Sequence, residues 1–310
     1  VAREGVLAAC LDGKLYAIGG GTSNGVSSVE IFDPQTSKWS DGPSLPTGVH
    51  RGAAVALDDR ILVFGGSGEE GTSNKVFEFK LSSNQWTSKE PMPTAREAHK
   101  AILLGGEVWV VGGINTNTDL DVVEVYDIER NSWSTRPNLT SPRAWPCAWS
   151  HNNQVFVSGG RSDRHNYLDS IEFFDQSSNK WSSFGNLPEV KYCADAAVLG
   201  NRVYIAAGST SKSTRSSKVF YADLKATQSF LFIEGSGDTD NASFTIEGDQ
   251  LKTAAEFNYE AKDEYTIRVK GTDSGGLSIE KTFTLNVTDG PDTPSEILLS
   301  NSTVDENQKK

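Results

Sequence analysis

The residue types that could carry catalysis are few in this 310-residue sequence, and they form no familiar catalytic motif. None of the histidines has the His-Glu-x-x-His spacing of a zinc hydrolase helix. His50 and His99 occupy related positions in two loops, so the sequence predicts polar loop residues there. No nucleophile elbow or phosphate-binding loop is present either.

Glutamates recur at nearly regular intervals, at Glu30, Glu78, Glu124 and Glu172. A catalytic acid and base are rarely copied into every unit of a repeat. The periodicity therefore favours a structural role, in which the glutamates pair with basic residues between blades.

Residues that break the periodicity are better candidates for recognition. Arginines and aromatic side chains gather in the loop at 160–169, beside neighbouring loops and in the segment 209–218, and these are the residue types that binding surfaces use. An ordinary solvated loop remains the alternative. The predicted ligand-binding face comprises Arg143, Trp145, Arg161, Arg164, His165, Tyr167, Tyr192 and Arg215.

Apolar runs that end in paired glycines determine how these residues are arranged. The run LYAIGG at 15–20 has three close copies and a weaker fifth copy, VYIAAG. The first residue of the pair recurs at intervals of 46, 47, 47 and 48 residues, at Gly19, Gly65, Gly112, Gly159 and Ala207. Such a period indicates a repeated supersecondary unit.

The rest of each unit is equally regular. A short alternating strand such as VEIFD at 29–33 precedes a tryptophan, a proline-bearing turn and a basic residue. Four strand signals per unit, without helical periodicity, predict four-stranded antiparallel sheets packed radially as a β-propeller. We expect the glycines to leave room for the ring of a tryptophan, which recurs at Trp39, Trp86, Trp133 and Trp181.

This pattern resembles the kelch repeat over roughly residues 1–225. The resemblance implies an all-β, kelch-type propeller of about five blades at 1–228, with the loops after the glycines and the proline loops on one face. Some propellers of this type are galactose-oxidase-like or sugar-epimerising enzymes. The copper enzymes use a tyrosine–cysteine crosslink, which Tyr192 and Cys193 cannot represent because they are adjacent.

Composition changes near residue 226, since 226–310 hold 7 basic and 16 acidic residues of a chain whose net charge is -12. Alternating strand candidates and the segment VKGTDSGG at 269–276 resemble a cadherin-like repeat of large surface adhesins. The resemblance implies a truncated cadherin-like, immunoglobulin-like β-sandwich at 229–289. Residues 290–310 then form a linker and the first strand of a next repeat, while 229–233 could pair with either domain.

The same resemblance implies calcium binding. In cadherin-like repeats, positions matching Glu260, Asp273, Asp289 and Asp292 supply carboxylates to Ca²⁺, which takes six to eight oxygen ligands. The Asp-x-Asp loop of the family is missing here, so we expect partial sites. Solvated acidic loops are the alternative.

The leading hypothesis is a non-enzymatic binding and adhesion module of an extracellular or cell-surface protein. Its propeller loops would bind a protein or glycan, and the cadherin-like part would be a calcium-dependent spacer that adjoins further repeats of the same chain. The acidic composition argues against nucleic acid as a partner, and no apolar run is long enough to span a membrane. A carbohydrate-active propeller enzyme and an intracellular kelch adaptor are the alternatives.

Overall fold

The structure is a computed structural model that describes residues 3–288, apart from 22–23, 201, 225–228, 248–249 and 273–277. The chain divides into two compact units, Val1–Leu224 and Lys225–Lys310. Both units consist of β-strands, and the described helical segment is the short 3₁₀ turn η1 (Asn241–Ser243). Within the described residues, no helix has the length and apolar character to cross a membrane.

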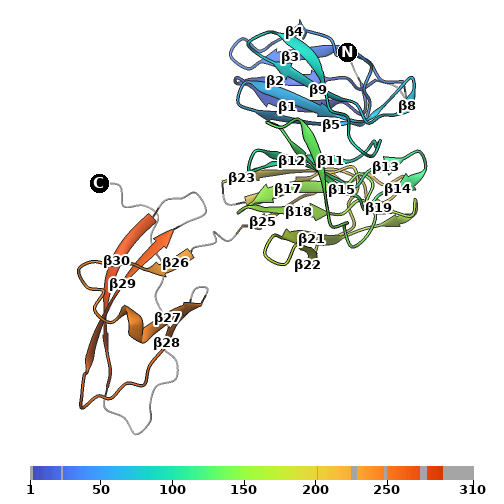
Figure 1. Ribbon diagram of the computed structural model, residues 1–310. Coiled ribbons are helices and arrows are strands. Elements are labelled where there is room, and N and C mark those ends of the chain that lie inside the picture. Colours follow the sequence, from blue (N-terminus) through green and yellow to red (C-terminus); the bar gives the residue numbers. More distant parts are fainter. Residues whose placement is uncertain are drawn as a thin grey trace. The chain divides into compact units, whose positions relative to one another are not determined.

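The first unit contains five antiparallel sheets that follow one another along the chain (Figure 1). The first two sheets hold β1 (Leu7–Leu11), β2 (Lys14–Ile18), β3 (Val29–Asp33) and β4 (Lys38–Gly42), then β5 (Ala53–Leu57), β6 (Arg60–Phe64), β9 (Val76–Lys80) and β10 (Gln85–Lys89). The third and fourth hold β11 (Lys100–Leu104), β12 (Glu107–Val111), β15 (Val123–Asp127) and β16 (Ser132–Arg136), then β17 (Cys147–His151), β18 (Gln154–Ser158), β21 (Ser170–Asp175) and β22 (Lys180–Asn186). The fifth holds β23 (Asp195–Leu199), β24 (Arg202–Ala206) and β25 (Val219–Asp223).

Four repeats therefore form the four-stranded antiparallel sheets that the sequence predicts, and the fifth sheet has three strands among the described residues. Short hairpins follow three of the glycine pairs and project from the ends of the sheets. They consist of β7 (Ser67–Gly68) with β8 (Gly71–Thr72), β13 (Ile114–Asn115) with β14 (Thr118–Asp119), and β19 (Arg161–Ser162) with β20 (Asn166–Tyr167).

Hydrophobic side chains fill the spaces between successive sheets. In β6, Ile61 and Val63 pack against the first sheet, whereas Leu62 and Phe64 join the cluster shared with the third sheet. Similar clusters lie between the third and fourth sheets and between the fourth and fifth. Because side chains alternate between the two faces of a strand, a nearly continuous apolar run can serve two cores at once.

The recurring tryptophan links each sheet to the preceding one. The indole Nε1–H groups of Trp86, Trp133 and Trp181 each donate a hydrogen bond of 2.9 Å to a backbone carbonyl of the sheet before, those of Pro43, Glu90 and Pro137. The indole therefore closes the outer part of the interface while its ring covers the apolar core.

The glycine pairs have a different role from the one predicted. A Cβ atom at Gly112 would lie 2.4 Å from the carbonyl oxygen of Arg143, which belongs to the segment entering the next sheet. The N–H of Gly113 donates to that same oxygen at 2.8 Å. The expectation that a tryptophan ring fills this space is wrong, because a backbone carbonyl occupies it.

Buried arginine–glutamate pairs support a structural role for the glutamates, but each pair joins a sheet to its own entering segment and not two blades, as the sequence predicted. Arg96 is fully buried, and its Nη2 lies 2.7 Å from Oε2 of Glu124, while its Nη1 donates to the carbonyls of Gly112 and Val122 at 2.9 Å. Arg143 pairs with Glu172 in the same way. Burial lowers the pKa of both arginines, and the glutamate opposite each one favours the charged form.

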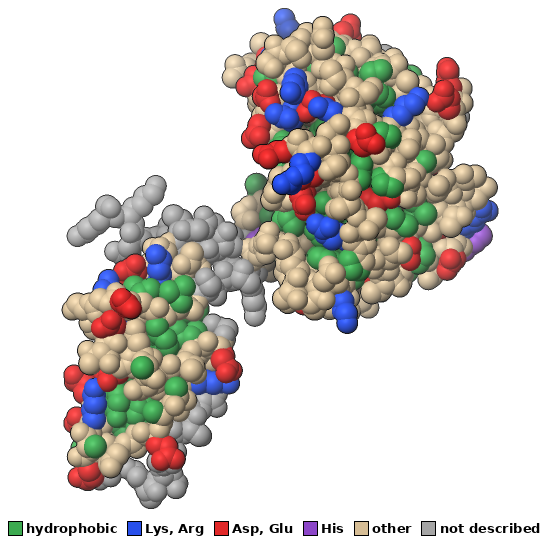
Figure 2. Space-filling model, in the orientation of Figure 1, with side chains coloured by type: hydrophobic (Ala, Val, Ile, Leu, Met, Phe, Trp, Pro, Cys, Tyr) green, Lys and Arg blue, Asp and Glu red, His purple; other side chains and the backbone are tan. Residues whose placement is uncertain are grey.

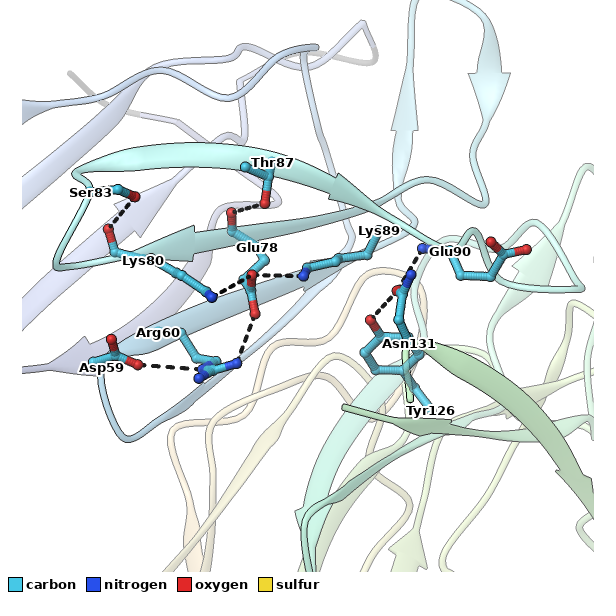
Figure 3. A network of polar contacts seen from close by, with 10 residues as sticks. All are labelled: Asp59, Arg60, Glu78, Lys80, Ser83, Thr87, Lys89, Glu90, Tyr126 and Asn131. Carbon is cyan, nitrogen blue, oxygen red and sulfur yellow. Dashed lines mark hydrogen bonds and ion pairs between the residues drawn. The ribbon is translucent and has the colours of Figure 1, made fainter. Parts of the chain in front are cut away.

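Glu78 does not belong to this set, which corrects the sequence interpretation. In the second repeat, Phe77 occupies the strand position that Glu124 occupies in the third repeat. Val49 occupies the position of the buried arginine. Both apolar side chains lie in one core cluster. Glu78 is one residue further along β9 and so points to the other face of the sheet, where it contacts Arg60 at 3.1 Å and Lys89 at 2.9 Å (Figure 3).

The second unit has its own core. The strand β26 (Ser229–Phe232) pairs with β29 (Glu264–Thr272), which pairs with β30 (Ser278–Asn286), so residues 229–232 belong to this unit rather than to the fifth sheet. A separate hairpin joins β27 (Phe244–Glu247) to β28 (Gln250–Thr253). The aromatic residues Phe244, Phe257 and Tyr265 pack in the core of the second unit. On the face shown in Figure 2, hydrophobic side chains gather along the middle of this unit and acidic side chains lie mainly towards its edges.

Removing one partner of a buried arginine–glutamate pair should be costly. We expect Arg96→Val to lower the free energy of unfolding by about 3–5 kcal/mol, because Glu124 is left charged and buried. Adding Glu124→Phe installs the Val49 and Phe77 pair of the second repeat and should recover most of the loss. Urea denaturation of both single variants and the double variant gives the coupling energy.

The exposed pair of Arg130 and Asp127 provides the control for this experiment, since the Arg130 side chain is 81% exposed. Arg130→Ala should cost less than about 1 kcal/mol. Losses that simply add in the Arg96→Val, Glu124→Phe double variant would contradict the assigned role.

The glycine pairs can be tested with a matched substitution. Gly112 and Gly105 have φ of 62° and 59°, but a Cβ at Gly105 meets nothing within 4 Å. Gly105→Ala should cost about 1–2 kcal/mol from backbone strain alone. Gly112→Ala should cost clearly more, because the added methyl group displaces the Arg143 carbonyl. Equal shifts in urea midpoint for the two variants would refute this reading.

Candidate functional site

One residue in each repeat links the five sheets into a backbone ladder. It lies two positions after the residue equivalent to Arg96, directly before the innermost strand of its sheet, and has φ between 50° and 59°. In the second to fifth sheets, the N–H of this residue donates to the carbonyl of the corresponding residue one sheet before, over distances of 2.7–3.2 Å. We call this set the axial ladder; its members are Gly5, Arg51, Ala98, Trp145 and Cys193.

Aromatic and cationic side chains meet at one part of the axial ladder. The guanidinium carbon of Arg161 lies 4.8 Å from the centre of the Trp145 ring, and that of Arg51 lies 5.6 Å from it. The ring centroid of Tyr192 lies 6.4 Å from that of Trp145, with the rings edge-on, and 4.8 Å from that of Tyr167. The structure thus brings together four residues of the predicted face, from loops far apart in the sequence, and adds Arg51. We call these five residues the cation–aromatic cluster.

Three other predicted residues lie near the cluster. Arg164 is exposed and its guanidinium donates to the carbonyl of Asn117 at 3.0 Å, while His165 beside it is exposed. Arg215 is exposed as well, and its Nη1 donates to Oγ of Ser209 at 2.8 Å. These three side chains lie at the edge of the cluster and face solvent.

Arg143 was predicted for the ligand-binding face, and the structure corrects this. Its side chain is 1% exposed and holds Glu172, Gly159 and Ser170. A guanidinium that is buried and fully engaged cannot reach a ligand. Arg143 therefore positions the loop that carries Trp145.

Sequence reasoning missed Arg51, Glu97 and Asp119. Asp119 holds Nη2 of Arg161 at 3.0 Å and also accepts the backbone N–H of Arg164, so it fixes the loop that carries both. Glu97 accepts from Ser67 Oγ at 2.7 Å and lies 4.0 Å from Arg51. A signal for Arg51 was available, because the ladder position varies among repeats whose other positions are regular.

Cys193 reports on the electrostatics of the cluster. Desolvation raises the pKa of its thiol to about 11, although Arg215, Arg51 and Arg161 act in the opposite direction. The thiol is therefore neutral at physiological pH. The three arginines therefore lie near one thiol, although Asp119 pairs with Arg161 and Glu97 lies 4.0 Å from Arg51.

His50 and His99 lie in loops, as predicted, but they are not solvated. They are 1% and 3% exposed. Desolvation lowers the pKa of His99 to about 3, with Arg96 and Lys100 adding to the effect. His99 is therefore neutral and forms part of the packing beside Gly65 and Gly113.

Two grooves open at other places on the first unit. A groove of about 490 Å³ is lined by loop residues of the first two sheets, including Gly25, Gly48 and Glu70. A second groove, of about 280 Å³, lies between the hairpin ends of the third and fourth sheets and includes Trp109 and Arg136. Neither groove contains a residue of the predicted face.

One of the four predicted calcium ligands lies among the described residues. Glu260 is exposed, and its backbone N–H donates to the Asn258 side chain at 3.0 Å. Asp273, Asp289 and Asp292 lie outside the described residues. Within the part of the chain that the structure describes, no three His, Cys, Asp or Glu side chains are grouped as a metal site.

The known families that this chain matches are matched by its repeated part. Residues 1–159 match the model of the KLHDC2/KLHL20/DRC7 Kelch-repeats domain, and residues 146–188 match the Kelch motif. The chain belongs to the kelch-repeat family. Its fold resembles that in the "Structure of YjhT", with a TM-score of 0.62, 16% identity, and coverage of 71% of this chain and 81% of that one. That likeness supports the propeller fold.

Similar stretches occur in proteins of several organisms. Human Kelch-like protein 33 is 40% identical over 62 residues, which is 20% of this chain and 12% of that protein. The F-box/kelch-repeat protein At5g39560 of Arabidopsis thaliana is 43% identical over 53 residues, or 17% and 13% of the two chains. The matched stretches thus span about an eighth of each relative's own length.

The buried histidine makes a prediction about pH. Because its folded pKa is about 3 against an ordinary 6.5, His99 binds a proton more readily when the chain unfolds. The resulting stability is present above pH 6.5 and falls by about 1.4 kcal/mol per pH unit towards pH 3. His99→Gln should flatten the dependence of unfolding free energy on pH between 6 and 4.

Comparing slopes rather than absolute stabilities keeps the test informative if His99→Gln is less stable. An unaltered slope in His99→Gln would mean that the side chain titrates as a solvated group.

Proposed function

We propose that the first unit is a non-enzymatic binding module whose cation–aromatic cluster holds a protein or glycan ligand. The observation that carries this proposal is the convergence of Arg51, Trp145, Arg161 and Tyr192 beside the axial ladder. Arginine, tryptophan and tyrosine are the residues that dominate binding energy at interfaces. Kelch-repeat propellers are typically protein-binding modules, which favours a protein ligand.

The cluster is well suited to recognition because its backbone is fixed. Trp145 and Arg51 extend from ladder residues whose N–H and C=O groups bond to neighbouring sheets. Asp119 fixes Arg161 from a third loop. A site whose side chains are held by such contacts loses little conformational entropy when a ligand binds.

The arginines in and around the cluster indicate which kind of ligand it would bind. Arg51, Arg161 and Arg215 all lie near Cys193, and Arg215 is exposed. This arrangement favours a partner segment that presents carboxylates, since complementary charge guides association and selects partners. Aromatic faces beside the arginines would then cover the apolar part of the segment.

The second unit completes the proposal as a spacer. Its acidic composition, including exposed Glu260, suits a calcium-dependent linker of an extracellular or cell-surface adhesion protein, as the cadherin-like resemblance implies. The first unit would then present the cluster to the ligand.

Binding should depend on the cluster and not on an equivalent pair elsewhere. Ligands selected on the whole chain from a peptide-display library and from a glycan array can be measured against Trp145→Ala and Arg161→Ala. We expect each to weaken binding about tenfold or more, which is the loss typical of central aromatic and arginine residues.

Arg136 supplies a matched control, because its guanidinium lies 5.3 Å from the Trp109 ring at the hairpin end of the third sheet. Arg136→Ala removes a similar cation–aromatic contact and should leave affinity unchanged. Selected ligands that are lost in Arg136→Ala and retained in both cluster variants would place the binding surface elsewhere.

A further inference from the structure

An ion pair joins the innermost strands of two sheets that are not neighbours. The ammonium of Lys100 in β11 donates to Oδ1 of Asp195 in β23 at 2.7 Å. The strand β17 contacts both β11 and β23 and lies between them. Because β18 pairs with β17 on its outer side, the ion pair passes β17 on the side that faces the propeller axis.

This ion pair lies directly beside the ladder residues of the cation–aromatic cluster. Lys100 comes two residues after Ala98, whose carbonyl accepts the N–H of Trp145, and Asp195 comes two residues after Cys193, whose N–H donates to Trp145. Desolvation raises the pKa of the Cys193 thiol, and the Lys100 ammonium opposes this effect together with the three arginines. The Lys100 side chain is 27% exposed, so it is a fourth cation of the cluster that solvent can reach.

The two charges break the repeat pattern at their position. Each of the five innermost strands begins with the equivalent residue, and in the other three repeats it is Leu7, Ala53 and Cys147. A lysine and an aspartate are therefore not needed to build this part of a sheet. As with the other residues of the cluster, the break in periodicity indicates a role in recognition.

Internal carboxylates already hold two arginines of the cluster, and each also holds a second group. Asp119 pairs with Arg161 and accepts a backbone N–H of the same loop at 2.9 Å. Glu97 lies 4.0 Å from Arg51 and accepts from the Ser67 hydroxyl at 2.7 Å. Moving either carboxylate away would leave a further donor unpaired, which is costly.

The carboxylate of Asp195 is held differently. Besides the Lys100 ammonium, its Oδ1 accepts the backbone N–H of the adjacent Ala196 at 2.9 Å. This second contact lies within one strand and does not depend on Lys100. A ligand carboxylate can therefore replace Asp195 at the ammonium without unpairing the Ala196 N–H.

We infer that Lys100 determines the specificity of the cluster for acidic peptides, and that Asp195 occupies its ammonium until a peptide carboxylate replaces it. The inference rests on the proposed function, since the cluster must hold the peptide. The contact with Asp195 is autoinhibitory, because it lowers the apparent affinity to the extent that Lys100 is engaged. A peptide without carboxylates cannot replace Asp195, so the pair selects against it.

Two matched peptides test this role on the whole chain. Acetyl-Glu-Glu-Tyr-Glu-Glu-amide presents carboxylates around an aromatic ring, and its counterpart has glutamine in place of each glutamate. Lys100→Met should weaken binding of the acidic peptide about tenfold, as expected for a lost charged hydrogen bond. Asp195→Asn should tighten it by up to about fivefold, the equivalent of one exposed ion pair. Neither substitution should change the affinity for the glutamine peptide.

A double variant separates lost attraction from repulsion by an unpaired Asp195. Lys100→Met with Asp195→Asn should bind the acidic peptide as weakly as Lys100→Met alone. Recovery of the unmutated affinity would mean that Lys100 only neutralises Asp195. The matched control is Asp223→Asn, which removes a paired aspartate at the other end of β24 and should leave the affinity unchanged.

The outcomes distinguish this inference from the proposed function. Loss of binding in Trp145→Ala, with no change in Lys100→Met and Asp195→Asn, would keep the cluster and refute the role of Lys100. Weaker binding in Lys100→Met alone, with none of the loss in Trp145→Ala, would support Lys100 and contradict the cluster. If Asp195→Asn lowers the urea midpoint and does not tighten binding, the pair only braces the sheets. Failure of the unmutated chain and of Asp195→Asn to bind the acidic peptide would overturn the inference as well.

Discussion

Close packing of backbone on backbone between sheets is the constraint on which the rest of the first unit depends. Each entering segment places one carbonyl, such as that of Arg143, in the space left by a glycine pair of the preceding sheet. Two residues later the ladder residue bonds to its counterpart. These contacts need φ near 60° at both places, which explains why glycines end the strand and why the ladder residues are strained. The buried arginine then ties the entering segment to its own sheet.

This arrangement suits ligand recognition, because the backbone of the ladder is fixed while its side chains differ from repeat to repeat. The ladder holds glycine, arginine, alanine, tryptophan and cysteine in one conformation. None of these five residues belongs to the apolar clusters between the sheets, so the larger side chains among them can contact a ligand. The strain at Trp145 and Arg51 is offset by hydrogen bonds on both sides, and strain of this kind is common at functional sites. Asp119 and Glu97 restrain the arginines around them.

Sequence periodicity predicted the sheets, the recurring tryptophan and a structural pairing of the glutamates with basic residues, since each follows from the spacing along the repeat. It failed where the outcome depends on strand register or on the neighbouring sheet. Glu78 and Glu172 both lie 13 residues after the first glycine of their pair, yet only Glu172 takes the strand position of Glu124. Glu78 pairs across the strands with Leu62 and so lies on the opposite face of its sheet. Burial of Arg143 and of His99 comes from the segments that pack over them, which one repeat cannot reveal.

Hydrogen exchange at the ladder amides tests the central claim most directly. The N–H groups of Arg51, Ala98, Trp145 and Cys193 each bond to the preceding sheet, whereas the hairpin amides at Gly105 and Gly106 have φ of 59° and 84° in an exposed turn. If the ladder holds the sheets together, the four ladder amides should exchange only through unfolding of the whole unit, with protection equal to its unfolding free energy. Exchange as fast as that of the hairpin amides would show that the sheets are joined without the ladder and would contradict the account.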